Sequence, residues 1–248
     1  MNKFIKLFSK IKNGFLDMLF PKHIKCIFCN EEISELNLYD SCNNCLSSLP
    51  FIQKDYCLHC GLPRNTGASG VCMFCKNENP TFTLARAVFK YEGKVRNIIQ
   101  NLKYNNAKYS VQPLAYFMFE TLKKLNWQID LITFVPIHSS KLKSRGYNQA
   151  QLLAQEISMF LDIECKDLFD KVTNTPTQTK LARQERRKNV QNSFKLKSKG
   201  FENKNILLID DVFTTGATVN ELSKILKNAK ARNVYVLTLA HSVLKEKI

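Results

Sequence analysis

The segment from 205 to 221, NILLIDDVFTTGATVNE, constrains the fold of this chain more than any other segment. Its four aliphatic residues, Ile206 to Ile209, predict a buried strand, and they run directly into two adjacent acids, Asp210 and Asp211. Each carboxylate raises the free energy needed to ionise the other, so the pair is costly unless something compensates it. The segment therefore predicts a strand that leads into a binding site.

The turn that follows the acids has the composition of a phosphate site. Backbone N–H groups at a helix N-terminus bind phosphate, threonine hydroxyls add donors, and glycine lets the phosphate approach closely. The turn supplies all three features just before a predicted helix at 217–230: Thr214, Thr215, Gly216, Ala217 and Thr218. Carboxylates accept strong hydrogen bonds from hydroxyls, so the two acids would suit the sugar of a phosphorylated ribose.

Strand-like and helix-like segments alternate beyond residue 80. Strands are predicted at 82–91, 130–136, 205–210 and 233–241, with a further candidate at 165–172, and helices at 94–103, 111–125, 147–161 and 217–230. This alternation predicts an α/β fold with a mostly parallel, twisted sheet flanked by helices. Ligands of such sheets bind beyond the carboxyl ends of the strands, where the polar segments 136–147 and 210–218 begin.

Eight of the nine cysteines form four Cys-x-x-Cys pairs in the first 75 residues, separated by 12, 11 and 11 residues. The pairs are Cys26/Cys29, Cys42/Cys45, Cys57/Cys60 and Cys72/Cys75. Two such pairs supply the four thiolates of a tetrahedral zinc site, so we expect two structural Zn²⁺ ions in a small module, residues 22–79. Sequential pairing closes shorter loops than crossed pairing and is favoured, by only about half a kcal/mol per site.

Other interpretations of the cysteines remain open. One pair could be redox-active, and His23 or His59, beside the pairs, could replace a thiolate. Cys165 stands alone and is expected to be a small buried apolar residue. The apolar residues at the start of the chain are interrupted by lysines, so no signal peptide is predicted. We therefore expect reduced cysteines and a cytoplasmic protein.

An amphipathic helix is predicted before the cysteines, in residues 1–21, with apolar residues at near-helical spacing between 3 and 19 and Pro21 at its end. It is too short and too charged to span a bilayer. Docking onto the rest of the protein is favoured, and peripheral contact with an anionic membrane is the alternative. At the other end of the module, Asn79-Pro80 predicts a boundary, after which 80–248 form the α/β domain.

The net charge points to polyanionic partners. Lysine and arginine number 37 against 21 acidic residues, a formal charge of +16, which suits nucleic acid, phosphorylated metabolites or an anionic surface. Three Lys-Tyr dipeptides place cations beside aromatic rings, as a strand of stacked bases requires: Lys90-Tyr91, Lys103-Tyr104 and Lys108-Tyr109. The alternative is chance in a chain rich in lysine and aromatic residues.

The stretch ILLIDDVFTTGAT resembles the complete signature of type I phosphoribosyltransferases. The resemblance implies the fold of that family for 80–248. It also implies that Asp210 and Asp211, the catalytic candidates, hold the ribose hydroxyls of phosphoribosyl pyrophosphate (PRPP), and that residues 214–218 hold its 5′-phosphate. Mg²⁺ would accompany the ligand. Neither a base-selecting hood nor a glutaminase-type nucleophile is recognisable, so the resemblance does not name an acceptor.

The whole chain resembles the ComF family, associated with natural competence, through DMLFP, the cysteine pairs, KYEGKVRNIIQNLKY, VPIHSSKLKSRGYNQAQLLA and TPTQTKLARQERRKNV. The stretch VPIHSSKLKSRGYNQ resembles a pyrophosphate-binding region, which implies candidate contacts at Lys141, Lys143, Arg145, Tyr147, Asn148 and Gln149. Residues 178–189 resemble a mobile loop that closes over ligand, with polar candidates Gln178, Arg183, Arg186, Arg187 and Asn189. Arginine offers a planar fork that suits phosphate oxygens.

Three functions are compatible with these residues. The first is a competence protein that binds PRPP and handles incoming single-stranded DNA. The second is a working phosphoribosyltransferase on a nucleobase or amine. The third is a regulatory protein that senses PRPP and binds a partner, such as a competence helicase. The first is favoured because the resemblance that implies it includes the cysteine module.

Overall fold

The computed structural model describes residues 25–33, 37–64, 70–173 and 192–242, and the chain divides into two compact units, Met1–Ser48 and Leu49–Ile248. The predicted helix in 1–21, His23 and the polar candidates between 178 and 189 lie outside the described residues. Within the described part, no helix is long and apolar enough to cross a membrane.

The described part of the first unit, 25–33 and 37–48, holds the Cys26/Cys29 turn and a short helix that carries Cys45. The backbone N–H of Cys26 donates to the carbonyl of Glu31 at 2.8 Å, and that of Asn30 donates to the carbonyl of Cys26 at 2.8 Å. Asn30 takes a left-handed conformation, φ 65°, which asparagine tolerates better than most residues. Helix α2 (Asn43–Ser48) follows and carries Cys45 on its buried side.

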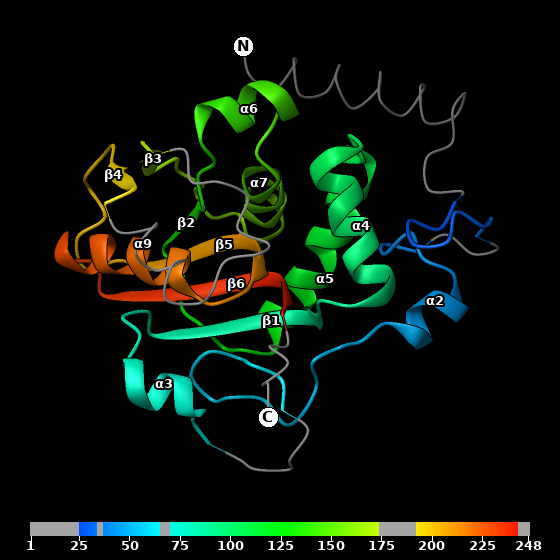
Figure 1. Ribbon diagram of the computed structural model, residues 1–248, viewed down its shortest axis with the longest axis horizontal. Helices are drawn as coiled ribbons and strands as arrows, with labels where there is room; N and C mark the ends of the chain where they lie inside the picture. The colour runs from blue at the N-terminus through cyan, green and yellow to red at the C-terminus, as the bar shows by residue number, and fades with distance from the viewer. Residues whose placement is uncertain (1–24, 34–36, 65–69, 174–191, 243–248) are drawn as a thin grey trace. The chain divides into compact units, whose positions relative to one another are not determined.

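A four-stranded parallel sheet forms the centre of the second unit (Figure 1). Its spatial order is β1 (Leu84–Lys90), β6 (Asn233–His241), β5 (Asn205–Phe213) and β2 (Leu131–Phe134). Every neighbouring pair is parallel, as the alternation of strands and helices predicts. The two central strands are almost wholly buried, which explains their continuous apolar runs.

Helices cover both faces of the sheet. Helices α5 (Val111–Lys123) and α7 (Gln149–Leu161) pack on one face, and Figure 1 shows them with α4 (Gly93–Tyr104) above the sheet and α3 (Met73–Glu78) below it. On the second face, α9 (Ala217–Asn228) buries Val219, Leu222 and Leu226 against alternate residues of β5 and β6. The shorter helices are η1 (Lys108–Ser110) and α6 (Ser139–Arg145).

The structure differs from the predicted elements at three places. Strand β5 does not end at the acids but continues to Phe213, because residues up to Phe213 pair with β6, including Asp210 with Thr238. The candidate strand at 165–172 becomes β3 (Phe169–Lys171), which pairs antiparallel with β4 (Phe194–Leu196) in a separate small sheet. Helix α6 falls in a segment that was expected to be a polar loop.

The division into units falls between Ser48 and Leu49, whereas the sequence suggests a boundary at 79–80. The physical reason is that the second group of four cysteines packs into the core beneath the parallel sheet. Residues 49–79 therefore belong, by packing, with the α/β unit.

Candidate functional site

The acidic pair lies near the carboxyl end of β5, next to the end of α4. Asp211 is 4% exposed, and its carboxylate forms an ion pair with the ammonium of Lys103 in the last turn of α4. Gln149, the first residue of α7, also lowers the pKa of the Asp211 carboxyl group. The sequence assigned Lys103 to a nucleic-acid surface, but the structure brings it to the acids.

The two carboxyl groups have opposite protonation tendencies. Burial raises the pKa of Asp211, but the charge and hydrogen bond of Lys103 outweigh burial and hold the pKa below its ordinary value. Burial and the neighbouring Asp211 charge raise the pKa of Asp210 well above its ordinary value. The Asp211 N–H donates to Asp210 Oδ1 at 2.8 Å. Asp211 is therefore the ionised member, and Asp210 is the member that can hold a proton.

Three further cations, Lys141, Arg145 and Lys171, interact with one another or with Lys103 and Asp210. Burial lowers the pKa of Lys141, and the positive charges of Arg145 and Lys103 lower it further. Burial and the charge of Lys141 lower the pKa of Lys171 to about 8, although the interaction with Asp210 raises it. Arg145 donates to Gln149 Oε1, which connects this cluster to the partner of Asp211. Like charges brought this close indicate a site for a multiply charged anion.

The turn after β5 has the geometry that the sequence predicts. Gly216 takes φ 74° at the N-terminus of α9, and a Cβ atom there would lie 2.7 Å from Cζ of Phe213. Only glycine fits both the conformation and the space. Thr215 is buried, and its hydroxyl accepts a 3.4 Å hydrogen bond from the N–H of Ala217, while Thr214 is exposed and Thr218 half-buried.

The other residues of the 138–149 segment have mainly structural contacts. Asn148 donates to the carbonyl of Val135 at 2.9 Å and caps α7 by accepting from the N–H of Ala150 at 3.0 Å. The buried Tyr147 hydroxyl donates to the carbonyl of Leu102. Lys143 is exposed. Of the six candidates in this segment, Gln149 therefore acts on Asp211 directly, while Arg145 contacts Gln149 and Lys141 interacts with Lys103.

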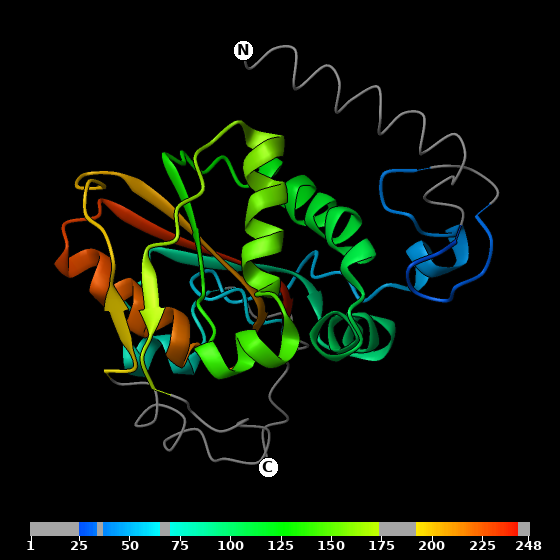
Figure 2. The ribbon, with the colours of Figure 1, turned by 90° about the horizontal axis from the view of Figure 1, so that it is seen from above.

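Aromatic rings and cations share a face formed by α4, η1 and α6. Figure 1 and Figure 2 both show α4 and α6 near each other. Tyr104 is 65% exposed and Tyr109 is 67% exposed. The guanidinium of Arg145 lies 5.4 Å from the ring centre of Tyr104, and Lys108 Nζ lies 4.6 Å from the ring centre of Tyr147. We call these residues with Lys143 the α4–α6 face. The third dipeptide, Lys90-Tyr91, lies at the end of β1 and is only half-exposed.

One site residue, Lys171, escaped the sequence analysis, and for another, Lys103, the ion pair with Asp211 was not foreseen. Lys171 ends the short strand β3, and a lysine at a strand end could have been singled out on that ground. Lys103 was noticed only for its tyrosine neighbour, because no local pattern reveals which distant carboxylate a helix end will meet. His138 was also missed; its ring accepts the N–H of Ser140 and caps α6.

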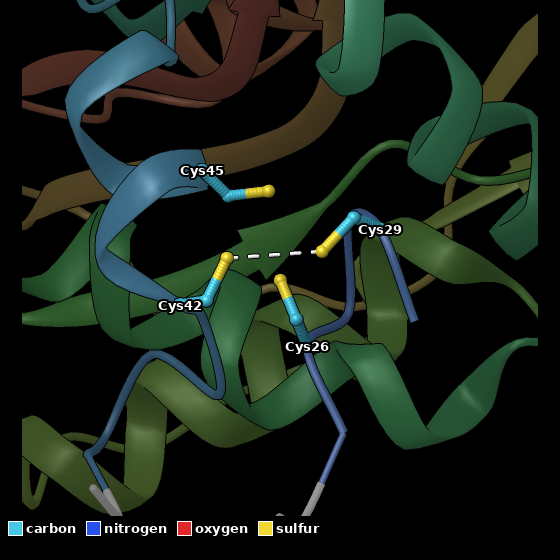
Figure 3. Close-up of side chains that lie close together, drawn as sticks. All are labelled: Cys26, Cys29, Cys42 and Cys45. Carbon is cyan, nitrogen blue, oxygen red and sulfur yellow. Dashed lines mark hydrogen bonds between the residues drawn. The ribbon is translucent and has the colours of Figure 1, made fainter. Parts of the chain in front are cut away.

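The cysteines gather as two groups of four, which confirms sequential pairing. In each group the four sulfur atoms lie within 4.8 Å of one another. Figure 3 shows the first group, with Cys29 and Cys42 Sγ atoms 3.7 Å apart; in the second, Cys60 and Cys72 lie 3.7 Å apart and Cys57 and Cys75 3.9 Å apart. Four Zn–S bonds of about 2.3 Å in a tetrahedron separate sulfurs by about 3.8 Å, so both groups fit Zn²⁺.

Neither His59 nor Cys165 joins these groups. His59 Nε2 lies 2.9 Å from the carbonyl oxygen of Phe82 instead of facing the sulfurs. Cys165 is half-buried, and burial raises its thiol pKa to about 11, which is consistent with an unreactive structural residue.

Comparisons with known proteins agree with this architecture. The double zinc ribbon domain family matches residues 15–76, and the phosphoribosyl transferase domain family matches residues 103–247. The chain is 31% identical to "Competence protein F" of Haemophilus influenzae over 230 residues, covering 89% of this chain and 98% of that protein. It is 26% identical to "Competence protein ComFC" of Streptococcus pneumoniae, with 87% and 99% covered.

A third relative, "DNA utilization protein YhgH" of Escherichia coli O157:H7, is 28% identical, with 88% of this chain and 97% of that protein covered. These alignments span both the cysteine segment and the α/β unit. The chain therefore belongs to the ComF family of competence proteins, built from a double zinc ribbon and a phosphoribosyltransferase domain.

Proposed function

We propose that this protein binds PRPP with Mg²⁺ at the acidic pair and that it handles single-stranded DNA during DNA uptake. The observation that carries the first part is the placement of Asp210 and Asp211 directly before a glycine turn that opens α9. Ribose hydroxyls would bind the carboxylates, and the 5′-phosphate would accept hydrogen bonds from the N–H groups of 214–218.

The surrounding cations support a pyrophosphate group in the same ligand. Lys141, Arg145 and Lys171 converge near the acids, and their mutual repulsion is relieved when an anion binds among them. Mg²⁺ would be held by the ligand oxygens and a carboxylate and would neutralise charge on the pyrophosphate. Lys103 keeps Asp211 ionised. Of the two acids, Asp211 is therefore better suited to bind Mg²⁺ or to accept a hydrogen bond from a ribose hydroxyl.

Single-stranded DNA is supported by a second set of residues, which shares Arg145 with the pyrophosphate cluster. The exposed rings of Tyr104 and Tyr109 offer stacking surfaces. Arg145 supplies positive charge over the ring of Tyr104, and Lys108, next to Tyr109 in the chain, supplies it over the ring of Tyr147. The names of the relatives, which concern competence and DNA utilization, point the same way.

Calorimetry tests the PRPP part. The wild-type chain is titrated with PRPP in the presence of Mg²⁺, beside Asp210→Asn/Asp211→Asn and the control Asp162→Asn, whose carboxyl group is exposed at the end of α7. We expect the control to bind like the wild type and the double variant to lose binding. Equal affinity of all three proteins would reject the assignment.

A salt titration of oligonucleotide binding tests the DNA part. Binding that involves several phosphates weakens steeply as salt rises, whereas a protein with no nucleic-acid site shows no binding even at low salt. Repeating the titration with PRPP present, and the calorimetry with single-stranded DNA present, shows whether the two ligands help or oppose each other.

A transferase reaction is the second candidate, favoured by the unequal protonation of the acids. A carboxyl group that can hold a proton beside one that is ionised is an arrangement suited to proton transfer. Acceptor-dependent release of pyrophosphate, abolished in Asp210→Asn/Asp211→Asn, would establish turnover. If PRPP binds but no pyrophosphate is released with any acceptor of a broad panel, the protein binds PRPP without catalysing the transfer.

A further inference from the structure

The second cysteine group, Cys57, Cys60, Cys72 and Cys75, is part of the core of the α/β unit. All four side chains are at least 94% buried. They share one apolar cluster with Ile206 and Leu208 of β5 and with Leu222 of α9. A zinc ribbon that was only attached to the surface of the domain would instead have a small core of its own.

Backbone contacts attach this ribbon to the edge strand β1. The N–H of Ala85 donates to the carbonyl of His59 at 2.8 Å, and Arg86 donates to the carbonyl of Leu58 at 3.1 Å. Gly61 approaches so closely that a Cβ atom there would lie 2.8 Å from the carbonyl oxygen of Ala85. The ribbon therefore sits against β1 in one fixed position.

A continuous line of ring contacts leads from the ribbon to the turn at 214–218, called the phosphate turn below. The ring of His59 lies 5.1 Å from that of Phe82 and 2.9 Å, through Nε2, from its carbonyl oxygen. Phe82 meets Phe213 edge-on, with ring centres 6.0 Å apart. Phe213 in turn fills the space beside Gly216, and it stacks on His241 at 4.6 Å.

A second connection runs from the end of the ribbon to α9. The N–H of Thr81 donates to Asn220 Oδ1 at 2.7 Å, in the first turn of α9. A small pocket of about 210 Å³ lies between the end of α3 and the phosphate turn. It is lined by Glu78 and Asn79 on one side and by residues 215–217 and Asn220 on the other. Both ends of the phosphate turn are thus held by residues that the ribbon positions.

We propose that the second zinc ribbon is a positioning element for the phosphate turn at 214–218. Zn²⁺ would cross-link the four thiolates and so fix His59, which holds Phe82 and through it Phe213 beneath Gly216. The first cysteine group belongs to the other compact unit, and the proposal concerns the second group alone. This inference concerns how the turn is held and does not depend on which ligand the turn binds.

Hydrogen–deuterium exchange on the full-length, zinc-loaded chain tests the proposal without any ligand. The decisive variant is His59→Ala, which keeps all four cysteines and removes the link to Phe82. Its matched control is Leu58→Ala, the neighbouring exposed side chain of the same ribbon. Zinc content is measured in parallel. We expect peptides spanning 212–220 to exchange about tenfold faster in His59→Ala and at the wild-type rate in Leu58→Ala.

Cysteine variants provide the second arm. Cys60→Ser should loosen 212–220 together with the core around it, whereas Cys26→Ser should leave that segment at the wild-type rate. The proposal is overturned if His59→Ala leaves 212–220 unchanged, or if Cys26→Ser loosens the segment as much as Cys60→Ser. Because no PRPP is present, these outcomes are independent of the calorimetry that tests the proposed function.

Discussion

Lys103 and Asp211 illustrate, at the scale of single residues, how a buried carboxylate is kept charged. Asp211 is buried, and without a cation its carboxylate would be expensive to ionise. The ammonium of Lys103 supplies that cation. In the proposed complex, ribose hydroxyls or Mg²⁺ would share the carboxylate with Lys103, so the residue prepares the site.

Replacing Lys103 with methionine should therefore destabilise the protein. The change leaves a buried carboxylate without its partner, and the free energy of unfolding at pH 7 should fall by about 3–5 kcal/mol. Denaturant unfolding measures it. The control is Lys123→Met, which removes an exposed ion pair with Glu120 and should change stability by less than about 0.5 kcal/mol. A Lys103 variant as stable as the control would contradict the buried-pair interpretation.

The same pair sets a pH dependence with a definite sign. The folded pKa of Asp211 lies below its unfolded value, so its contribution is present above the unfolded pKa and is lost as pH falls through the folded pKa. The stability difference between wild type and Lys103→Met should accordingly be largest near neutral pH and shrink below about pH 4. Unfolding measured from pH 3 to 8 checks this.

Gly216 should tolerate no side chain. Gly216→Ala combines an unfavourable φ of 74° with a contact of 2.7 Å to Phe213. We expect a loss of about 1–3 kcal/mol in stability and a weakened affinity for PRPP. Gly200→Ala is the matched control, because φ there is 92° but nothing lies within 4 Å of the added atom. Equal effects of the two changes would show that backbone strain alone, without the contact to Phe213, accounts for the loss of stability.

Lys171 should make anion binding pH-dependent above pH 8. Its pKa is lowered to about 8, so the free protein loses this charge in mildly alkaline solution. Bound phosphates would favour the ammonium form, so binding between pH 8 and 10 should take up a proton and weaken by up to about tenfold per pH unit. Calorimetry in two buffers of different ionisation enthalpy measures the proton uptake, which Lys171→Gln should lack and Lys195→Gln, on the exposed side of β4, should retain.

At the scale of elements, local pattern predicted most of the sheet and its helices but not where they end. The apolar runs at 130–136 and 233–241 lie at β2 and β6, and the helical spacing at 111–125 lies at α5. The extension of β5 through the acids depends on pairing with β6, which no local pattern contains. Helix α6 depends on a histidine cap and on Gly146, φ 79°, at its end, and the sequence gives α6 no apolar stripe.

The α4–α6 face also arises only when distant segments meet. Its tyrosines were visible in the sequence as Lys-Tyr dipeptides, but Arg145 joins them from a segment about forty residues away because Tyr147 hydrogen-bonds to Leu102. Stacking of a base on each exposed ring contributes about 1–3 kcal/mol. The face thus combines the aromatic surface and the positive charge that the proposed single-strand site requires.

Alanine at Tyr104 or Tyr109 should therefore weaken oligonucleotide binding roughly fivefold to hundredfold. The control is Met159→Ala on α7, which removes a side chain of similar exposure without an aromatic ring. Lys108→Ala should reduce the slope of affinity against salt by about one phosphate contact. Fluorescence anisotropy of a labelled single strand measures both, and tyrosine variants that bind like Met159→Ala would remove this face from the proposal.

At the scale of the whole molecule, the two cysteine groups have the same chemistry and different structural settings. Spacing alone predicts two equivalent zinc sites in one module, and on that basis loss of zinc should unfold 22–79 and spare much of the α/β domain. Packing leads to a different expectation. Cys57, Cys60, Cys72 and Cys75 lie in the core that supports β5 and α9, whereas the first group lies in the unit Met1–Ser48.

Loss of the second group should consequently lower the melting temperature of the α/β unit, and loss of the first should not. Removing a structural zinc costs several kcal/mol, and each kcal/mol shifts the melting temperature of a unit this size by about 2–4 °C, so Cys57→Ser/Cys60→Ser should melt about 10 °C lower. Scanning calorimetry of the full chain measures this beside Cys26→Ser/Cys29→Ser, for which the main transition should stay in place. If both double variants shift that transition equally, the two ribbons stabilise the protein as one module, and the division between Ser48 and Leu49 has no thermodynamic meaning.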